Sequence, residues 1–416
     1  MNKIQAILII GFLFFSQQFV NAQTSQNNES LQKVGSLDSI YSKKLKEYRT
    51  FYVQLPADYD ATKKEKYPVA FILDGEVFLP TVHNVQSFYS GGFTPEMVLI
   101  GISNANNRVR DLTTSKITEI NGMPFNQENG EAANFSDFIE TELIPFVENK
   151  YSVTSFRTLI GHSYGGLFTI YSLIHHPQLF SNYLAIDPSL DWDNQKLLAE
   201  AKEKLSSNDY KGKSLFVSLS GQLHMQNSKI TLDNVMQDSS GFTSFPRANI
   251  AFSDIVKQNK KNGLAYDWKF YPRDLHGTVP FPSIMDGLIF NFEWFQMEGM
   301  DKFNSFDTPK EELLSIIKHR EKKLKEHFGY AVPPYPEFLL NMSGYMNMDM
   351  EQMEKAKMYF ELCIEYYPKS ANSYDSMADY YERNNDNENA IKFVKKALEI
   401  NNDDYYKERI EKLKKK

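Results

Sequence analysis

The chain has 416 residues, of which 42% are hydrophobic and 24% are charged, and its formal net charge is −7. This composition supports a large buried core, and the length indicates two or three domains. The negative charge argues against nucleic acids and anionic membrane surfaces as partners. Cys363 is the single cysteine, so no intrachain disulfide is expected, and its apolar helical surroundings indicate a buried structural thiol. No His/Cys cluster has the spacing of a zinc site, and we expect no metal or cofactor.

The first 22 residues have the pattern of a secretory signal. Lys3 precedes an apolar run at 7–15, and Val20-Asn-Ala22 forms a cleavage pattern after it. The run is shorter than the roughly 20 residues that a membrane-spanning helix needs. We therefore expect cleavage after Ala22, a secreted or periplasmic protein, and no membrane span in the mature chain.

A folded domain is expected over residues 48–297, after a polar leader at 23–47. Seven stretches predict strands, at 52–56, 67–73, 97–102, 158–160, 183–186, 214–219 and 266–271. Helical patterns lie between or after them, at 131–149, 165–176, 194–206, 247–261 and 283–297. This alternation predicts a mostly parallel sheet with helices on both faces. Sites on such sheets gather at the carboxyl ends of the strands.

The segment 158–166 carries the motif Gly161-x-Ser163-x-Gly165, between an apolar run and a helical run. Small residues on both sides let the strand and helix pass closely, and they force Ser163 into a strained, exposed position. The same turn directs the Tyr164 N–H toward a developing oxyanion. We expect Ser163 to be a nucleophile; the alternative is a glycine-rich packing turn with an incidental serine.

Two further segments end strands at the same edge of the predicted sheet. Asp274-Leu-His-Gly277 follows the last strand and places His276 where it can act as the general base for Ser163, with His224 as a rival. Asp74-Gly75-Glu76 follows an earlier strand. The backbone of Glu76 or its neighbour is a candidate second oxyanion donor, and a plain strand-to-helix turn is equally consistent with the pattern.

These motifs resemble those of the putative esterase family, which includes siderophore esterases, feruloyl esterases and S-formylglutathione hydrolase. The resemblance runs from about Arg49 to Phe295. It rests on the segments 107–113, 161–166, 187–190, 276–280 and 286–288. It implies an α/β-hydrolase fold, with Ser163 as the nucleophile, His276 as the base and no cofactor.

The triad acid is where this sequence departs from the family. The family places Asp or Glu just after the strand at 214–219, where this chain has Gln222. We expect Asp238, in the long loop 221–246, to be the acid, with a Ser-His dyad as the alternative. Asp187 is interpreted as a turn or helix-cap residue.

Two groups of side chains near these segments have open roles. The loop 221–246 carries Met225, Met236, Phe242 and Phe245, which either bind an apolar acyl group or pack into the core. A second loop holds Arg108, Arg110 and Asp111; a structural Arg–Asp pair is favoured there over contact with an anionic or hydroxylated substrate.

The composition changes after Phe295. Residues 298–335 predict a linker and an amphipathic helix at 309–327. A period of 34 then links Ala356 to Ala390 and Gly344 to Ala378. This period resembles the tetratricopeptide repeat, with units at 336–369 and 370–403 and a capping helix at 404–416. The helix at 309–327 or the sheet domain must cover the open end.

The sequence therefore predicts an α/β-hydrolase fold followed by an all-α helical-repeat domain, in a secreted or periplasmic serine esterase. The expected reaction proceeds through an acyl-serine intermediate. Siderophore esters, polysaccharide-linked acyl esters and small acyl esters all fit as substrates. The alternatives are acyl transfer and a non-catalytic binding protein that acts through its repeats, which Gln222 at the acid position favours. The repeats are expected either to bind a protein or peptide or to serve as a stabilising or dimerising appendage.

Overall fold

The computed structural model describes residues 33–57, 59–61, 66–120 and 122–415. The predicted signal at 1–22 lies outside these residues, as does the first part of the predicted leader. The chain divides into a short unit, 1–35, and a large unit, 36–416.

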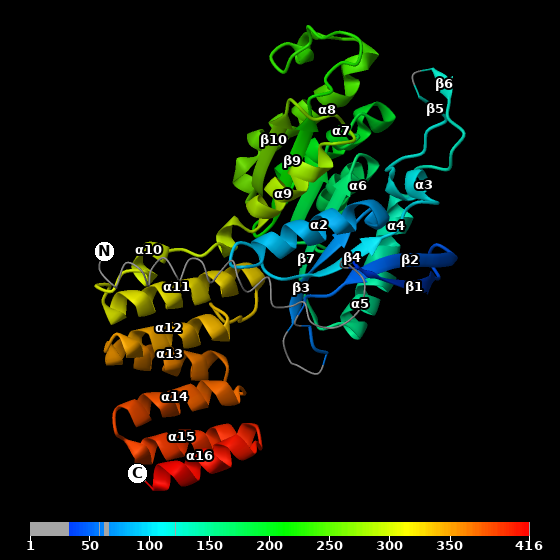
Figure 1. Ribbon diagram of the computed structural model, residues 1–416. Helices are drawn as coiled ribbons and strands as arrows, with labels where there is room; N and C mark the ends of the chain where they lie inside the picture. Colours follow the sequence, from blue (N-terminus) through cyan, green and yellow to red (C-terminus); the bar gives the residue numbers. More distant parts are fainter. Residues whose placement is uncertain (1–32, 58, 62–65, 121, 416) are drawn as a thin grey trace. The chain divides into compact units, whose positions relative to one another are not determined.

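An eight-stranded sheet lies at the centre of the first part of this unit (Figure 1). Its strands, in spatial order, are β1 (Ser36–Ser42), β2 (Glu47–Gln54), β4 (Val98–Ile102), β3 (Tyr67–Ile72), β7 (Val153–His162), β8 (Asn182–Ile186), β9 (Ser214–Ser220) and β10 (Ala265–Tyr271). The strands from β4 to β10 run parallel, and β1 and β2 add two antiparallel pairings at one edge. The prediction of a mostly parallel sheet is confirmed. A separate small hairpin pairs β5 (Glu119–Ile120) with β6 (Met123–Pro124).

Strand β1 lies within the segment that the sequence analysis assigns to an exposed leader, and that assignment is wrong for residues 36–42. β1 is one of the two edge strands, and among the described residues it pairs with β2 alone, in antiparallel register from Ser36↔Val53 to Ser42↔Glu47. Most of its side chains are exposed or half-buried, and Leu37 remains 65% exposed. Such a strand lacks the continuous apolar run that marks the central strands.

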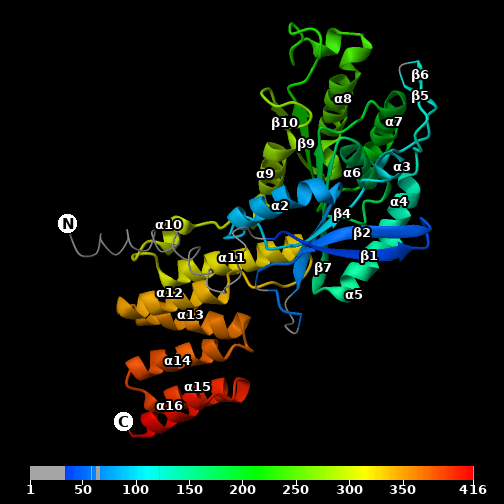
Figure 2. The same cartoon turned by 45° about the vertical axis from the view of Figure 1, so that its right-hand side comes forward.

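Helices cover both faces of the sheet (Figure 2). One face carries α2 (Gly75–Tyr89) and α9 (Pro280–Asn291), which pack on each other. The other carries α4 (Ala132–Phe138), a π-helical segment (Ile139–Leu143), α5 (Ile144–Lys150), α6 (Tyr164–His175), α7 (Trp192–Ser207) and α8 (Ser244–Gln258). The short helix α3 (Arg108–Leu112) packs on α4 and α6. Short 3₁₀ turns lie at Val235–Gln237, Gly241–Thr243, Lys260–Asn262 and Glu293–Phe295.

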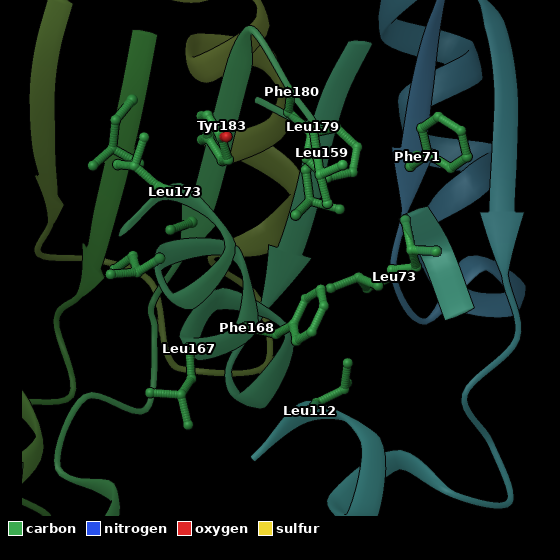
Figure 3. Packing of buried hydrophobic residues seen from close by; sticks show 14 of the residues in the cluster. Phe71, Leu73, Leu112, Leu159, Leu167, Phe168, Leu173, Leu179, Phe180 and Tyr183 are labelled. Atoms are coloured by element: carbon green, nitrogen blue, oxygen red, sulfur yellow. The ribbon is translucent and has the colours of Figure 1, made fainter. Parts of the chain in front are cut away.

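The main core lies between the sheet and α6 (Figure 3). Phe71 on β3, Leu159 on β7 and Tyr183 on β8 are fully buried. Phe168 and Leu173 on α6 pack in the same cluster. Each such side chain contributes about 1.5–3 kcal/mol through burial. The packing fixes α6, and therefore the turn that precedes it, against the sheet.

The second part of the unit is all helical. It contains α10 (Met300–Phe303), α11 (Lys310–Phe328), α12 (Glu337–Asp349), α13 (Met353–Tyr366), α14 (Ala371–Arg383), α15 (Asn387–Ile400) and α16 (Asp404–Lys414). The helical-repeat domain is confirmed, and α12 to α15 form its two helix pairs. A Cβ on Gly344 would clash with the ring of Phe360, which explains the small residue at that position. Within the described residues, no helix combines the length and apolar character that crossing a bilayer requires.

Helix α11 covers the start of the repeats. Its Leu313 and Ile317 are buried in one cluster with Met358 and Cys363 of α13. Burial raises the pKa of the Cys363 thiol to about 12, so the predicted buried structural cysteine is confirmed. Coverage of the open end by this helix is also as expected.

The end of α11 also contacts the sheet domain. Phe328 packs edge-to-face on Phe156, with 5.0 Å between ring centroids. His327 stacks on Trp294 at 4.3 Å. Just beyond the helix, the Tyr330 hydroxyl donates a hydrogen bond of 3.0 Å to Oγ1 of Thr154. Because these contacts bury aromatic surface, α11 belongs to the packing of both parts.

Candidate active site

The turn between β7 and α6 places Ser163 at the carboxyl end of a central strand. Ser163 has φ 60° and ψ −116°, a conformation that L residues rarely adopt. Its N–H donates to the carbonyl of Ile186 on the neighbouring strand, at 3.0 Å. A Cβ on Gly161 would clash with the carbonyl of Gly165, so strand and helix pass as closely here as the motif predicts. A Cβ on Gly165 itself would make only ordinary contact with Leu73.

His276 follows β10, and its ring reaches across to Ser163. Nε2 of His276 lies 3.0 Å from Oγ of Ser163. The N–H of His276 donates to Oε1 of Gln222 at 3.3 Å, and Phe245 packs edge-on against the imidazole at 5.4 Å. The structure therefore brings together the predicted nucleophile and base. The residue at the family's acid position, Gln222, holds the backbone of the histidine.

Asp187 supplies the carboxylate, and the expectation of Asp238 is wrong. Nδ1 of His276 lies 2.7 Å from Oδ2 of Asp187, which is fully buried. Its Oδ1 accepts a hydrogen bond of 2.9 Å from the N–H of Ser220. Asp238 instead accepts hydrogen bonds from the N–H of Ser240 at 2.6 Å and from Oγ1 of Thr243 at 3.3 Å. These bonds tie Asp238 into a local turn of its own loop.

The position of Asp187 follows from the strand order. Asp187 directly follows β8, which lies beside the strand of Ser163. The residue has φ 42°, and its N–H donates to the carbonyl of Ser218 on β9 at 3.1 Å. This left-handed turn is the feature that the sequence analysis interprets as a turn aspartate. The same turn directs the carboxylate at His276, so the alternative of a Ser-His dyad does not fit this geometry.

His162 lies beside the imidazole of His276. Its ring packs on that of His276 with 4.5 Å between centroids, and Nε2 donates to the carbonyl of His276 at 2.9 Å. Burial, together with the neighbouring His276, lowers the pKa of His162 to about 4. The ring is therefore neutral at pH 7 and adds no positive charge next to His276.

A cavity of about 360 Å³ opens over Ser163 and His276. Its other lining residues are Asp74, Glu76, Val77, Phe78, Ala105, Arg108 and His162. The expected oxyanion donors, the N–H groups of Tyr164 and Glu76, belong to the first turns of α6 and α2. Backbone N–H groups at such positions have no partner within their own helix and carry a partial positive charge. Both helices thus begin at the site, and the donor roles remain predictions.

Arg108 is a cavity residue that the sequence analysis favours only as structural. Its Nε donates to Oδ1 of Asp74 at 2.9 Å, and Nη2 donates to the carbonyl of His162 at 3.0 Å. The guanidinium also lies over the Tyr164 ring at 5.4 Å. Burial raises the pKa of Asp74, whose Oδ2 has no hydrogen-bond partner among the described residues. Arg108 lies at the start of α3, soon after β4, and its place after a predicted strand was the sequence signal for it.

Arg110 behaves as the structural alternative expects. Its guanidinium pairs with Glu47 at 2.6 Å and with Asp111 at 2.8 Å. The Asp111 carboxylate is buried and also pairs with Arg49 at 2.7 Å. This network connects α3 to β2. It fixes α3, whose first residue is Arg108, and does not line the cavity over Ser163.

The loop between β9 and α8 flanks His276. Met225, Met236 and Phe242 are 73%, 48% and 58% exposed, so these three do not pack into the core. Nδ1 of His224 accepts from the N–H of Gln226 at 3.0 Å. His224 also packs on Phe242, so it is not the base that Ser163 contacts. Substrate contact by the exposed side chains remains a prediction.

Family models match both parts of the chain. The model of the putative esterase family matches residues 42–269, more than half of the chain. A tetratricopeptide-repeat model matches residues 339–370 and 371–404. The bounds of these two matches lie within three residues of the units expected at 336–369 and 370–403.

The chain is also similar to individual proteins. It is 31% identical to a siderophore enterobactin esterase of Emericella nidulans over 183 residues, which span 41% of this chain and 59% of that protein. It is 27% identical to the ferri-bacillibactin esterase BesA of Bacillus subtilis over 209 residues, 46% of this chain and 72% of that one. The match thus spans less than two thirds of the fungal protein. A solved structure, an IroE-like serine hydrolase from Shewanella oneidensis, has 28% identity and a TM-score of 0.63, and the match covers 80% of this chain and 99% of that one.

Proposed function

We propose that this chain, which belongs to the putative esterase family, hydrolyses siderophore esters through an acyl-serine intermediate. The observation that carries the proposal is the chain of contacts from Ser163 to His276 to Asp187, at 3.0 and 2.7 Å. A hydroxyl, an imidazole and a buried carboxylate in this order form the constellation that activates a serine for acyl transfer.

In the proposed mechanism, Oγ of Ser163 attacks the ester carbonyl while Nε2 of His276 takes its proton. Asp187 accepts the Nδ1–H bond, fixes the tautomer and stabilises the imidazolium that forms. The N–H groups of Tyr164 and Glu76 stabilise the oxyanion. His276 then passes its proton to the leaving alcohol. A water molecule attacks the acyl-serine in the same way and releases the acid.

Siderophore esters are favoured as substrates because two relatives are named for them. A cavity of about 360 Å³ lies near the lower end of small-molecule sites, so it encloses only part of a large siderophore. Val77 and Phe78 supply an apolar wall, and Arg108 is the cation beside it. Polysaccharide-linked acyl esters share the same reacting group and are the second substrate class to test.

A secreted or periplasmic location is part of the proposal. It rests on the signal-like residues 1–22, which end at Ala22. Expression with the native leader, followed by mass determination of the mature protein, tests it. We expect a mature chain that begins at Gln23; a chain that keeps residues 1–22 in the cytoplasm contradicts the proposed location.

The activity is tested with purified protein on a tris-catecholate trilactone, a feruloyl ester and p-nitrophenyl acetate. Ser163→Ala is expected to lower kcat by at least about 10³-fold while the circular dichroism spectrum stays unchanged. Ser206→Ala is the matched control, because Ser206 is an exposed serine at the end of α7. A fluorophosphonate probe should label Ser163 in the wild type and in the control. Full turnover by Ser163→Ala would overturn the proposal.

The same assay separates the alternatives. Acyl transfer is recognised when an added sugar alcohol captures the acyl group and less free acid forms. The non-catalytic alternative drew its support from Gln222, and Asp187 removes that support because it provides the missing carboxylate. Absence of turnover on every ester, with an unlabelled Ser163, would restore that alternative.

A further inference from the structure

The first helix of the repeats carries an apolar stripe that the fold does not use. Phe338, Met342 and Met346 of α12 are 63%, 45% and 52% exposed. They are spaced by four residues, so they lie along one side of the helix. The buried residues of α12, namely Leu340, Gly344 and Met348, recur at the same interval on another side and pack within the repeats. The exposed stripe is therefore additional to the helix's structural face.

The next helix on this side carries three carboxylates. Asp375, Asp379 and Glu382 of α14 are spaced by four and three residues and thus share one side. All three contact Arg409 of α16, at 2.6 Å for Asp375 and 3.2 Å for Glu382. One guanidinium faces three carboxylates, so this cluster keeps an excess of two negative charges when all its groups are ionised.

The apolar stripe and the carboxylates adjoin. Tyr345 follows Met342 by three residues and Phe338 by seven, which places it on the side of the stripe. Its hydroxyl donates to Oδ2 of Asp379 at 2.6 Å and contacts Oγ of Ser376 at 3.2 Å. Together, α12, α14 and α16 form one surface, the inner face, with these residues: Phe338, Met342, Tyr345, Met346, Asp375, Asp379, Glu382 and Arg409.

We propose that the inner face binds a peptide segment of a partner protein in which apolar side chains are followed by Lys or Arg. Exposed methionine side chains adapt to apolar groups of different shapes. The excess of negative charge beside them attracts cations and disfavours acidic segments. This inference concerns a site apart from the cavity over Ser163 and does not depend on the proposed esterase activity.

The proposal commits to a partner peptide rather than to a second copy of the chain. A second copy is the natural competitor, because residues 410–416 read Ile-Glu-Lys-Leu-Lys-Lys-Lys and have the required composition. In the structure, however, Ile410 and Leu413 of α16 are buried against the repeats of the same chain, so α16 does not offer these side chains to another copy. Releasing it would expose its apolar side chains.

Binding is measured with the full-length protein and two fluorescent 12-residue peptides, one of Leu and Lys and one of Leu and Glu in the same order. Fluorescence anisotropy at about 0.15 M salt should show at least tenfold tighter binding of the Lys peptide. The double variant Met342→Ser with Met346→Ser should weaken that binding at least tenfold. Glu382→Gln should weaken it about threefold.

Matched controls come from elsewhere on the surface. Met123→Ser changes a methionine that is 69% exposed on β6, and Glu411→Gln changes an exposed glutamate of α16. Both should bind the Lys peptide as the wild type does. Circular dichroism checks the fold of each variant, and turnover of p-nitrophenyl acetate should be the same in all of them, which keeps this test separate from that of the active site.

Three results would overturn the proposal. Equal binding of the two peptides would show that the carboxylates do not select the partner. If the inner-face variants and their controls weaken binding of the Lys peptide equally, then the binding depends on the overall charge of the protein and not on the inner face. Concentration-dependent dimerisation that Met342→Ser with Met346→Ser abolishes, without peptide binding by the wild type, would make a second copy the occupant.

Discussion

The sheet domain and the helical repeats both contain strained non-glycine residues, but they use them differently. In the sheet domain, Ser163 and Asp187 adopt positive φ at the carboxyl ends of adjacent strands. In the repeats, Glu351 and Asn385 have φ of 60° and 59°, and they lie 34 residues apart, in the turn of each helix pair. Strain at the strand ends aims a particular side chain at a partner. In the repeats, the strained residue only closes the turn of a helix pair, and the same turn recurs in the second repeat.

This difference predicts where each part is sensitive. The contacts of the site join residues that are 113 and 89 positions apart in the sequence, so a small displacement of any strand end changes the chemistry. The helices of the repeats contact mainly their sequence neighbours. Substitutions of the contacting side chains Ser163 and Asp187 should therefore change the rate far more than the stability, and substitutions in the repeats should leave the rate unchanged.

The largest expected effect is that of Asp187→Asn. An asparagine amide donates toward Nδ1 of His276 and favours the wrong tautomer, so kcat should fall by about 10³- to 10⁴-fold. Asp238→Asn is the matched control and should stay within about threefold of the wild type, because Asp238 caps its own loop. Both are measured as initial rates on one fast ester. A greater loss in Asp238→Asn than in Asp187→Asn would contradict the assigned triad.

Three glycines compare how tightly the backbone packs in the two parts. Gly161→Ala directs a Cβ into the backbone of Gly165 and should lower the free energy of unfolding by about 3 kcal/mol. In Gly344→Ala, the added Cβ contacts only the ring of Phe360. Because the higher helix propensity of alanine offsets part of the cost, the free energy of unfolding should fall by about 1 kcal/mol. Gly241→Ala enters open space and should change little. Urea unfolding measures all three; a greater loss in Gly344→Ala than in Gly161→Ala would reverse the order.

Much of this architecture could be predicted from the sequence because its signals are local. The central strands are apolar runs, and the elbow at Ser163 lies within a single short motif. The extent of helix α2 was not predicted, because Asp74-Gly75 at its start is typical of a turn and Pro80 within it removes a helical hydrogen bond. Strand β1 was missed because an edge strand has little buried surface.

The acid could not be predicted because it depends on the order of the strands. Asp187 and Asp238 both follow predicted strands, and resemblance to a family favours the loop after β9. Only the arrangement β7-β8-β9 shows that the end of β8 lies next to Ser163. The period of 34, by contrast, needs no knowledge of long-range pairing, and the repeat boundaries came within three residues.

The next prediction concerns pH and the neutral ring of His162. Folding lowers its pKa from 6.5 to about 4, so between these values the unfolded chain binds a proton that the folded chain does not. Lowering the pH through this range therefore favours unfolding, by up to roughly 2–3 kcal/mol. His162→Gln should remove that part of the pH dependence. His319→Gln, which changes a largely exposed histidine, should keep it.

The measurement is urea unfolding at pH 7, 6, 5 and 4.5, with the slope of stability against pH compared between variants. Ionisable groups that do not interact with His162 contribute equally to all variants, so the difference between slopes reports on His162 and the groups beside it. If the wild type and His162→Gln lose stability in parallel, then the ring is not held neutral by the fold, and burial beneath His276 has a smaller effect than we infer.

The smallest expected effect tests whether the two parts unfold together. Tyr330→Phe removes the hydrogen bond to Thr154, which also accepts a hydrogen bond of 3.2 Å from the N–H of Phe156. Because that acceptor keeps a partner, the loss should be only about 1 kcal/mol. Tyr374→Phe is the matched control, because the Tyr374 hydroxyl donates to the carbonyl of Pro368 within the repeats. If α11 joins both parts into one cooperative unit, Tyr330→Phe lowers the midpoint of a single transition followed by sheet and helix signals alike. Two separate transitions, with only the helical one shifted, would show that the sheet domain folds independently of the repeats.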